Sequence, residues 1–272
     1  MITLLRHELV LTRAMLGVVG GAAVLVAAVG ALFAATGWPV LAPVGTMLTV
    51  GAVFAVVPAA QIVLAVAYWQ SSYGRRGYLT QTLPVRGSSI YWAKTVWAWL
   101  VSLAGIALSL GIALAVSPLV GTGDGTGRGD LFRPLREGWA RLVEMAPAWG
   151  VVAIVVAVVS LVLIWPVQYF FAASIGSQAP LNRLGVGGPV VVWVGVYLVT
   201  QVATFASFAL VPLAIGVDDG RLSIVRFAVF VEMVAGTPAD VMPIGFLPAL
   251  LVVALVCVVW SVRSWNRRVS LV

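Results

Sequence analysis

Six long stretches of this chain contain no Asp, Glu, Lys, Arg or His. Each is long enough to cross a bilayer as a helix, which takes about 20 apolar residues for a hydrocarbon core of roughly 30 Å. Apolarity is continuous rather than alternating, and Gly and Ala recur throughout, which favours packed helices over a membrane β-barrel. We therefore predict an all-α, polytopic integral membrane protein with six transmembrane helices. The expected spans are approximately 16–35, 44–69, 96–120, 148–173, 189–215 and 244–262.

Composition excludes the soluble classes of protein. Hydrophobic residues make up 62% of the 272 residues and charged residues only 9%, whereas soluble domains carry about 45–50% and about 25%. The chain has one Cys and one His, too few for a zinc site. A Ser-His-Asp triad would have to use His7, whose position beside the N-terminus and just before a span argues against hydrolase chemistry. We expect no catalytic site, no metal and no cofactor in this chain, and no binding of nucleic acid.

The energy source for any transport must be sought elsewhere. Ion-coupled carriers usually need ionisable groups at mid-membrane, and the six spans have none, although sodium carriers can use backbone carbonyls instead.

A P-loop requires two glycines and a Lys. Lys94 is the only Lys, and Ser88 and Ala93 stand where the glycines should be. The chain therefore has no nucleotide site of this kind.

Basic residues predict the orientation. With six spans, both termini lie on one side, and that side holds ten Lys and Arg residues against six on the other. By the positive-inside rule both termini are cytoplasmic. Arg6 and Arg13 precede the first span as they would a signal peptide, but the apolar run is long for that role, so we expect a retained helix.

Three segments outside the spans have recognisable patterns. Residues 1–15 look like an amphipathic interfacial helix, separate from the membrane domain at 16–272, or a plain basic anchor. Residues 134–146 carry an apolar stripe typical of a surface helix on the outer side. Residues 222–243 are apolar but too short to span, so they predict either a re-entrant hairpin or a surface helix.

The inner loop 70–94 is basic and also carries apolar residues. Gly77 and Pro84 divide it into short pieces. Such a loop suits docking of a cytoplasmic partner, although its basic residues could equally bind anionic lipid.

This loop and the six-span plan resemble the membrane permease subunit of type-2 ABC exporters. That family has cytoplasmic termini, an N-terminal elbow helix and a coupling helix in the loop after the second span. The loop often shows a Gly, a Leu-rich stretch, then Leu-Pro-Val-Ser-Arg and a Lys that opens the third span. Here those positions are Gly77, Leu79, Leu83, Pro84, Val85, Arg86 and Lys94. One departure is Arg75-Arg76 before the Gly, where members commonly have acidic residues.

The resemblance implies a function and partners. A cytoplasmic ABC ATPase would dock on the coupling loop and bind ATP and Mg, and a second permease copy or a relative would complete the pathway. The protein would export a drug, peptide or lipid across a bacterial plasma membrane. A secondary carrier acting alone and a non-transporting scaffold subunit are the alternatives. The expected docking residues are Arg76, Gly77, Tyr78, Leu79, Leu83, Pro84, Val85 and Arg86.

A few polar residues inside the spans could line a pathway. An uncharged pathway would suit an amphiphilic substrate. Interhelical hydrogen bonding is the other interpretation of the same residues. The candidates are Gln61, Gln168, Gln201 and Thr204.

Overall fold

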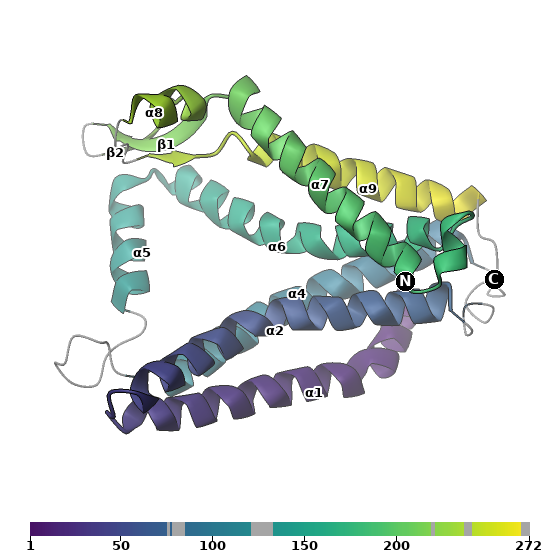
Figure 1. Ribbon diagram of the computed structural model, residues 1–272, viewed down its shortest axis with the longest axis horizontal. Helices are drawn as coiled ribbons and strands as arrows, with labels where there is room; N and C mark the ends of the chain where they lie inside the picture. The colour runs from purple at the N-terminus through teal and green to yellow at the C-terminus, as the bar shows by residue number, and fades with distance from the viewer. Residues whose placement is uncertain (75–76, 78–84, 121–132, 219–220, 237–240, 268–272) are drawn as a thin grey trace. The chain divides into compact units, whose positions relative to one another are not determined.

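The computed structural model describes residues 1–74, 77, 85–120, 133–218, 221–236 and 241–267. Six helices in this part of the chain are long and apolar enough to cross a membrane, which confirms the helical, multi-span prediction. Figure 1 labels them along the ribbon. They are α1 (Ile2–Ala35), α2 (Leu41–Ser72), α4 (Gly87–Val116), α6 (Ala148–Gly176), α7 (Gly187–Leu210) and α9 (Leu247–Arg267).

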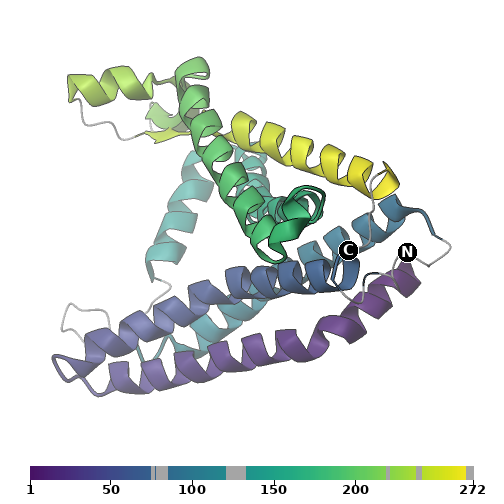
Figure 2. The ribbon, with the colours of Figure 1, turned by 45° about the vertical axis from the view of Figure 1, so that its right-hand side comes forward.

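Helix α1 joins two segments that the sequence analysis separated. It runs without interruption from Ile2 to Ala35, so residues 1–15 do not form a helix of their own. Figure 2 shows α1 changing direction toward its N-terminal end. The Thr12 hydroxyl donates to the Glu8 carbonyl at 2.8 Å, and such back-bonding to residue i−4 often bends a helix.

The chain divides into two compact units, which are described separately. The first comprises Met1–Tyr68 and Trp92–Trp139, and in it α1, α2 and α4 run side by side (Figures 1 and 2). Its core consists of small and β-branched side chains, including Ala27, Ala31 and Val56. Small residues let helix backbones approach closely, which drives helix association in membranes.

Helices α1 and α2 approach each other closely at Gly30 and Gly45. A Cβ atom added at Gly30 would lie 2.6 Å from Thr49 Oγ1. The Thr49 hydroxyl in turn lies 2.9 Å from the Gly45 carbonyl and 3.3 Å from the Ala27 carbonyl. A side chain at position 30 would therefore force the two helices apart.

The second unit comprises Trp69–Tyr91 and Ala140–Val272. In it α6, α7 and α9 contact one another, and the short 3-10 helix η1 (Leu181–Leu184) connects α6 to α7. A helix is present where one was expected at 134–146: α5 (Arg133–Met145), whose residues are divided between the two units.

A small sheet in the second unit corrects the all-α prediction. Strands β1 (Leu213–Asp218), β2 (Arg221–Arg226) and β3 (Met242–Pro243) form an antiparallel sheet in the order β2-β1-β3. The expected span 189–215 is too long, because α7 ends at Leu210 and Pro212 has no N–H to continue a helix. β-Branched residues such as Ile215 and Val217 then favour a strand.

In the segment 222–243 the structure describes a strand and a short helix, and whether the segment is re-entrant or lies on the membrane surface stays a prediction. Its first part is strand β2, which pairs with β1 from Leu213↔Arg226 to Asp218↔Arg221. The helix α8 (Val229–Ala235) that follows has only 7 residues, and it ends at Gly236, whose φ is 67°. Residues 237–240 lie outside the described part of the chain.

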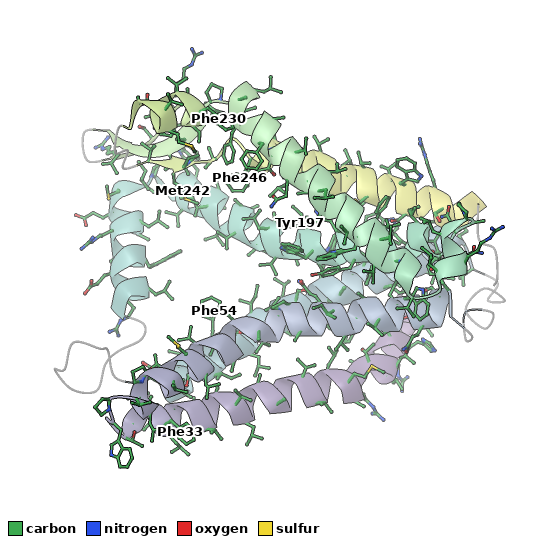
Figure 3. All side chains as sticks on the ribbon, in the orientation of Figure 1. Phe33, Phe54, Tyr197, Phe230, Met242 and Phe246 are labelled. Atoms are coloured by element: carbon green, nitrogen blue, oxygen red, sulfur yellow. The ribbon has the colours of Figure 1, made fainter. Side chains whose placement is uncertain are left out.

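Aromatic side chains connect this sheet region to α7. The rings of Phe208 and Phe246 are 6.0 Å apart, and those of Phe205 and Phe230 are 6.5 Å apart. Figure 3 shows Phe230, Met242 and Phe246 together near the strands. The Ser207 hydroxyl also donates a hydrogen bond to the carbonyl of Gly245. These contacts fix the start of α9 against the end of α7.

Candidate functional site: the loop between α2 and α4 and its anchors

The predicted docking loop is described only at its edges. Gly77, Val85 and Arg86 lie within the described residues. The remaining docking candidates lie outside them: Arg76, Tyr78, Leu79, Leu83 and Pro84. The structure therefore tests how the loop is held, and the coupling helix itself stays a prediction.

The three described loop residues have different surroundings. The Gly77 N–H donates to the Gly74 carbonyl at 2.7 Å, and a Cβ at Gly77 would lie 2.7 Å from the Ser72 carbonyl oxygen. Val85 is exposed. Arg86 directly precedes α4, and its carbonyl accepts the Ser89 N–H at 2.9 Å.

Both ends of this loop rest on one tryptophan of α9. Trp265 is only 5% exposed. Its ring lies 5.8 Å, centroid to centroid, from the ring of Tyr73, which follows the end of α2. At the other end, a Cβ on Gly87 would lie 2.6 Å from the Trp265 carbonyl oxygen, so only glycine allows α4 to begin this close to α9. Trp265 thus fixes the distance between the two ends of the loop.

Two further hydrogen bonds tie the same end of the second unit together. The Trp69 indole N–H donates to the Ser177 hydroxyl at 3.0 Å, which joins α2 to the end of α6. The Gln178 amide donates to the Ser264 hydroxyl at 2.6 Å, which joins that end to α9. The anchors of the loop are therefore connected to α6 as well as to α9.

In the first unit, a buried ion pair joins α1 to α4. Lys94 Nζ lies 2.7 Å from Glu8 Oε1, and the side chains are 4% and 12% exposed. Lys94 Nζ is also 6.0 Å from the centroid of the Tyr68 ring, at the limit of a cation–π contact. Burying a charge is costly unless it is paired, so each of these two side chains holds the other in place.

A second contact one turn away continues this connection. The Trp97 indole N–H donates to the Thr12 hydroxyl at 3.0 Å. Positions 8 and 12 lie on one face of α1, and positions 94 and 97 lie on one face of α4. The two pairs together fix both the register and the rotation of α1 against α4. We call Glu8, Thr12, Lys94 and Trp97 the α1–α4 clamp.

Sequence reasoning missed the α1–α4 clamp. It gave Glu8 no role and placed Lys94 at the end of the basic loop 70–94. The available signal was that Glu8 is the one acidic residue among the N-terminal-side segments and Lys94 the one Lys in the chain. A charge pattern alone could not show that residues 86 positions apart would meet.

The candidate pathway residues have the following positions. Gln61 is buried in the first unit, and its amide donates to the Ser102 hydroxyl at 3.0 Å. In the second unit, Gln168 of α6 is buried and Thr204 of α7 is half-buried. Gln201 of α7 is exposed, and its amide donates to the Tyr197 hydroxyl at 3.0 Å. The hydrogen bond of Gln61 joins α2 to α4, as expected if this residue serves helix packing.

The buried polar groups of these two units position helices against one another. In the part of the chain that the structure describes, no group of three or more His, Cys, Asp or Glu side chains could hold a metal ion. The buried polar groups instead link one helix to another.

Comparison with known proteins gives no relative. No protein-family model matches the chain, and neither a curated protein nor a solved structure matches it.

Proposed function

We propose that this chain is the permease subunit of an ATP-driven exporter, moved by a separate ATPase that docks on the loop between α2 and α4. The observation that carries the proposal is the contact of both loop ends with Trp265 of α9. A force applied to a loop whose ends are fixed in this way moves the attached helices as a rigid body, instead of being absorbed by the loop.

The charge distribution supports docking on this side. The long helices are apolar. The segments expected on the same side of the membrane as the two termini carry ten of the 16 basic residues. This bias favours a cytoplasmic position for the loop, which a soluble ATPase would then reach. The six helices of one chain would form half of the pathway, and a second permease would supply the other half.

The proposed substrate is amphiphilic: a drug, a peptide or a lipid. The side chains available to meet it inside the spans are mainly apolar, with a few uncharged polar groups such as Gln168 and Thr204. Charged substrates would need compensating charges, because an unpaired charge in the membrane interior is costly. The plasma membrane of a bacterium is the proposed location.

Substitution of Leu83 by Asp tests the docking loop. The variant places a charge at an apolar loop position, so we expect it to abolish copurification of the ATPase while membrane insertion is retained. Leu135→Asp is the matched control, because Leu135 is an exposed residue of α5 on the opposite side of the proposed topology. Unchanged ATPase association in Leu83→Asp would contradict docking on this loop. Equal loss in Leu135→Asp would contradict its specificity.

A further inference from the structure

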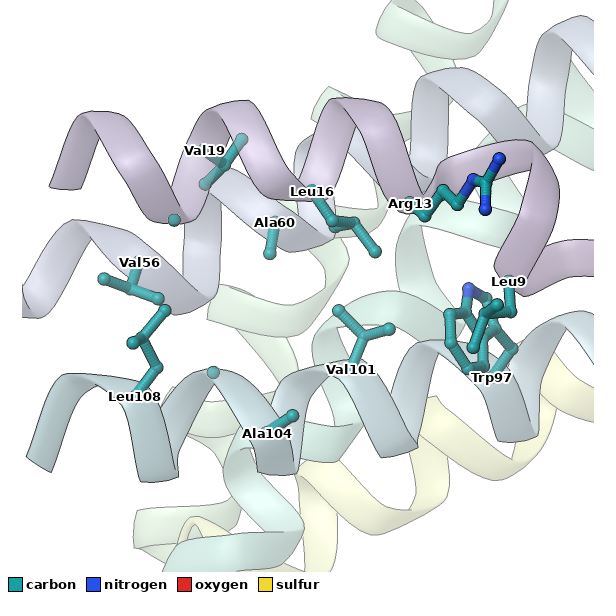
Figure 4. Close-up of a pocket in the computed structure, with 12 residues that line it drawn as sticks. Leu9, Arg13, Leu16, Val19, Val56, Ala60, Trp97, Val101, Ala104 and Leu108 are labelled. Carbon is teal, nitrogen blue, oxygen red and sulfur yellow. The ribbon is translucent and has the colours of Figure 1, made fainter. Parts of the chain in front are cut away.

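The first unit contains a pocket of about 300 Å³ between α1, α2 and α4 (Figure 4). Its walls are apolar, with Leu16 and Val19 from α1, Val56 from α2, and Val101 from α4. The volume lies at the lower end of the range of small-molecule sites, which is about 300–1,000 Å³.

Small residues give the pocket its depth. Gly20, Ala60, Ala104 and Gly105 contribute to its lining. A Cβ added at Gly20 would lie 3.3 Å from Leu108 Cδ2, so larger side chains at these positions would fill the space between the walls. Close helix packing does not remove this space, because the same small residues that permit packing leave it open.

One end of the pocket is basic. Figure 4 shows Arg13 at the end where Leu9 and Trp97 lie, with Val19, Val56 and Leu108 at the other end. Within the described residues, no carboxylate oxygen lies within 4.0 Å of the Arg13 guanidinium. Glu8, which is five residues earlier on α1, is paired with Lys94 instead. Arg13 is exposed and can pair with an external anion.

The length of the pocket matches one leaflet of a bilayer. From Trp97 to Leu108 the α4 axis rises about 16 Å, at about 1.5 Å per residue. Half of a hydrocarbon core of about 30 Å is about 15 Å. An occupant that runs from Arg13 along this wall therefore has a charged end at the membrane surface and an apolar tail in one leaflet.

We propose that this pocket binds one acyl chain of a negatively charged phospholipid, with the lipid phosphate paired to Arg13. The apolar walls take the chain, and the guanidinium can hold two phosphate oxygens at once. Bound there, the lipid would contact both helices of the α1–α4 clamp. The inference goes beyond the proposed function and does not depend on it, since it requires only that the first unit lies in a membrane.

Native mass spectrometry of the full chain in detergent tests the proposal, with dioleoyl phosphatidylglycerol and dioleoyl phosphatidylcholine as the two probes. We expect one retained phosphatidylglycerol and about tenfold weaker retention of phosphatidylcholine, because the choline ammonium of phosphatidylcholine offsets the phosphate charge and would lie close to the Arg13 guanidinium. Equal retention of the two lipids by the wild-type chain would overturn the proposal.

Two pairs of variants separate the acyl site from the charge site. Ala104→Phe fills the pocket and should remove phosphatidylglycerol retention, whereas Ala107→Phe, on the same helix but outside the lining, should keep it. Arg13→Gln should abolish the preference for phosphatidylglycerol, whereas Arg6→Gln should keep it. Both arginines are exposed, so this second pair tests the proposal even if Ala104→Phe fails to fold.

The same spectra report the alternative occupant, a second copy of the chain. If Ala104→Phe lowered the dimer fraction and left phosphatidylglycerol retention unchanged, the pocket would be a protein interface and the lipid proposal would be wrong. Retention of lipid by Arg13→Gln at the wild-type preference would also overturn it.

Discussion

Lys94 Nζ of α4 lies 2.7 Å from Glu8 Oε1 of α1, and both side chains are buried. Hydropathy places both residues outside the expected spans, with Glu8 before the first span and Lys94 just before the third. A buried charge without its partner costs about 3–5 kcal/mol, but replacement of both partners by apolar groups is often nearly neutral. The pair therefore specifies how α1 meets α4 more than it adds stability.

Removing one partner of this pair should destabilise the first unit. We expect Lys94→Met and Glu8→Leu each to lower the free energy of unfolding by about 3–5 kcal/mol, and the double variant to recover most of the loss. Thermal unfolding in detergent measures this. Arg6→Gln, an exposed charge change on α1, is the control with no expected effect. Additive losses in the double variant would show that the pair does not hold the helices.

The contact between Gly87 and Trp265 should not tolerate a methyl group. In Gly87→Ala the new Cβ would lie 2.6 Å from the Trp265 carbonyl. We expect a loss of about 1–3 kcal/mol, as for other overpacked sites, and weaker association with the ATPase.

Gly111→Ala is the matched control for Gly87→Ala. It lies on the same helix with nothing within 4 Å of an added Cβ, so it should be neutral or stabilising by up to about 1 kcal/mol. Equal melting temperatures for the two variants would contradict the close approach of α4 to α9.

The crossing of α1 and α2 gives a similar comparison. A Cβ at Gly30 would lie 2.6 Å from Thr49 Oγ1, whereas a Cβ at Gly21 on the same helix meets nothing within 4 Å. Gly30→Ala should therefore lower the melting temperature and Gly21→Ala should not. A chain that melts at the same temperature with either substitution would show that the backbones are not in this contact.

The bond between Gln61 and Ser102 separates two roles for a polar residue in a span. If Gln61 acts in packing, a double-mutant cycle with Gln61→Leu and Ser102→Ala should give a coupling energy of about 0.6 kcal/mol, the average for such bonds in a membrane protein. If Gln61 lines a pathway instead, we expect no coupling and a change in substrate-stimulated ATPase activity.

Hydropathy was enough to place the six long helices, because crossing a bilayer fixes both length and composition. Hydropathy predicted the ends of these helices less accurately. Helix α4 begins at Gly87, nine residues before the expected span, and includes Lys94. The charge of Lys94 argued for a loop, but the buried Glu8 carboxylate compensates it. A contact between distant residues decides that boundary, and composition carries no information about it.

The sequence contains signals for the sheet, but its continuous apolarity outweighed them. Pro212 ends a helix, and Asp219-Gly220 between runs of Ile and Val is a common hairpin signal. The continuous apolar run instead predicted a span that extends to residue 215. The α1–α4 clamp and the Trp265 anchors needed the structure, because each joins residues from different helices.

In the proposed function a separate ATPase drives this chain. Purification of the tagged chain from the membranes of its own organism, with quantification of bound proteins by mass spectrometry, tests that claim most directly. We predict an ATPase with an intact P-loop at a fixed stoichiometry of one per permease chain. Uphill transport of a solute by the purified chain in liposomes, with no such ATPase present, would contradict it.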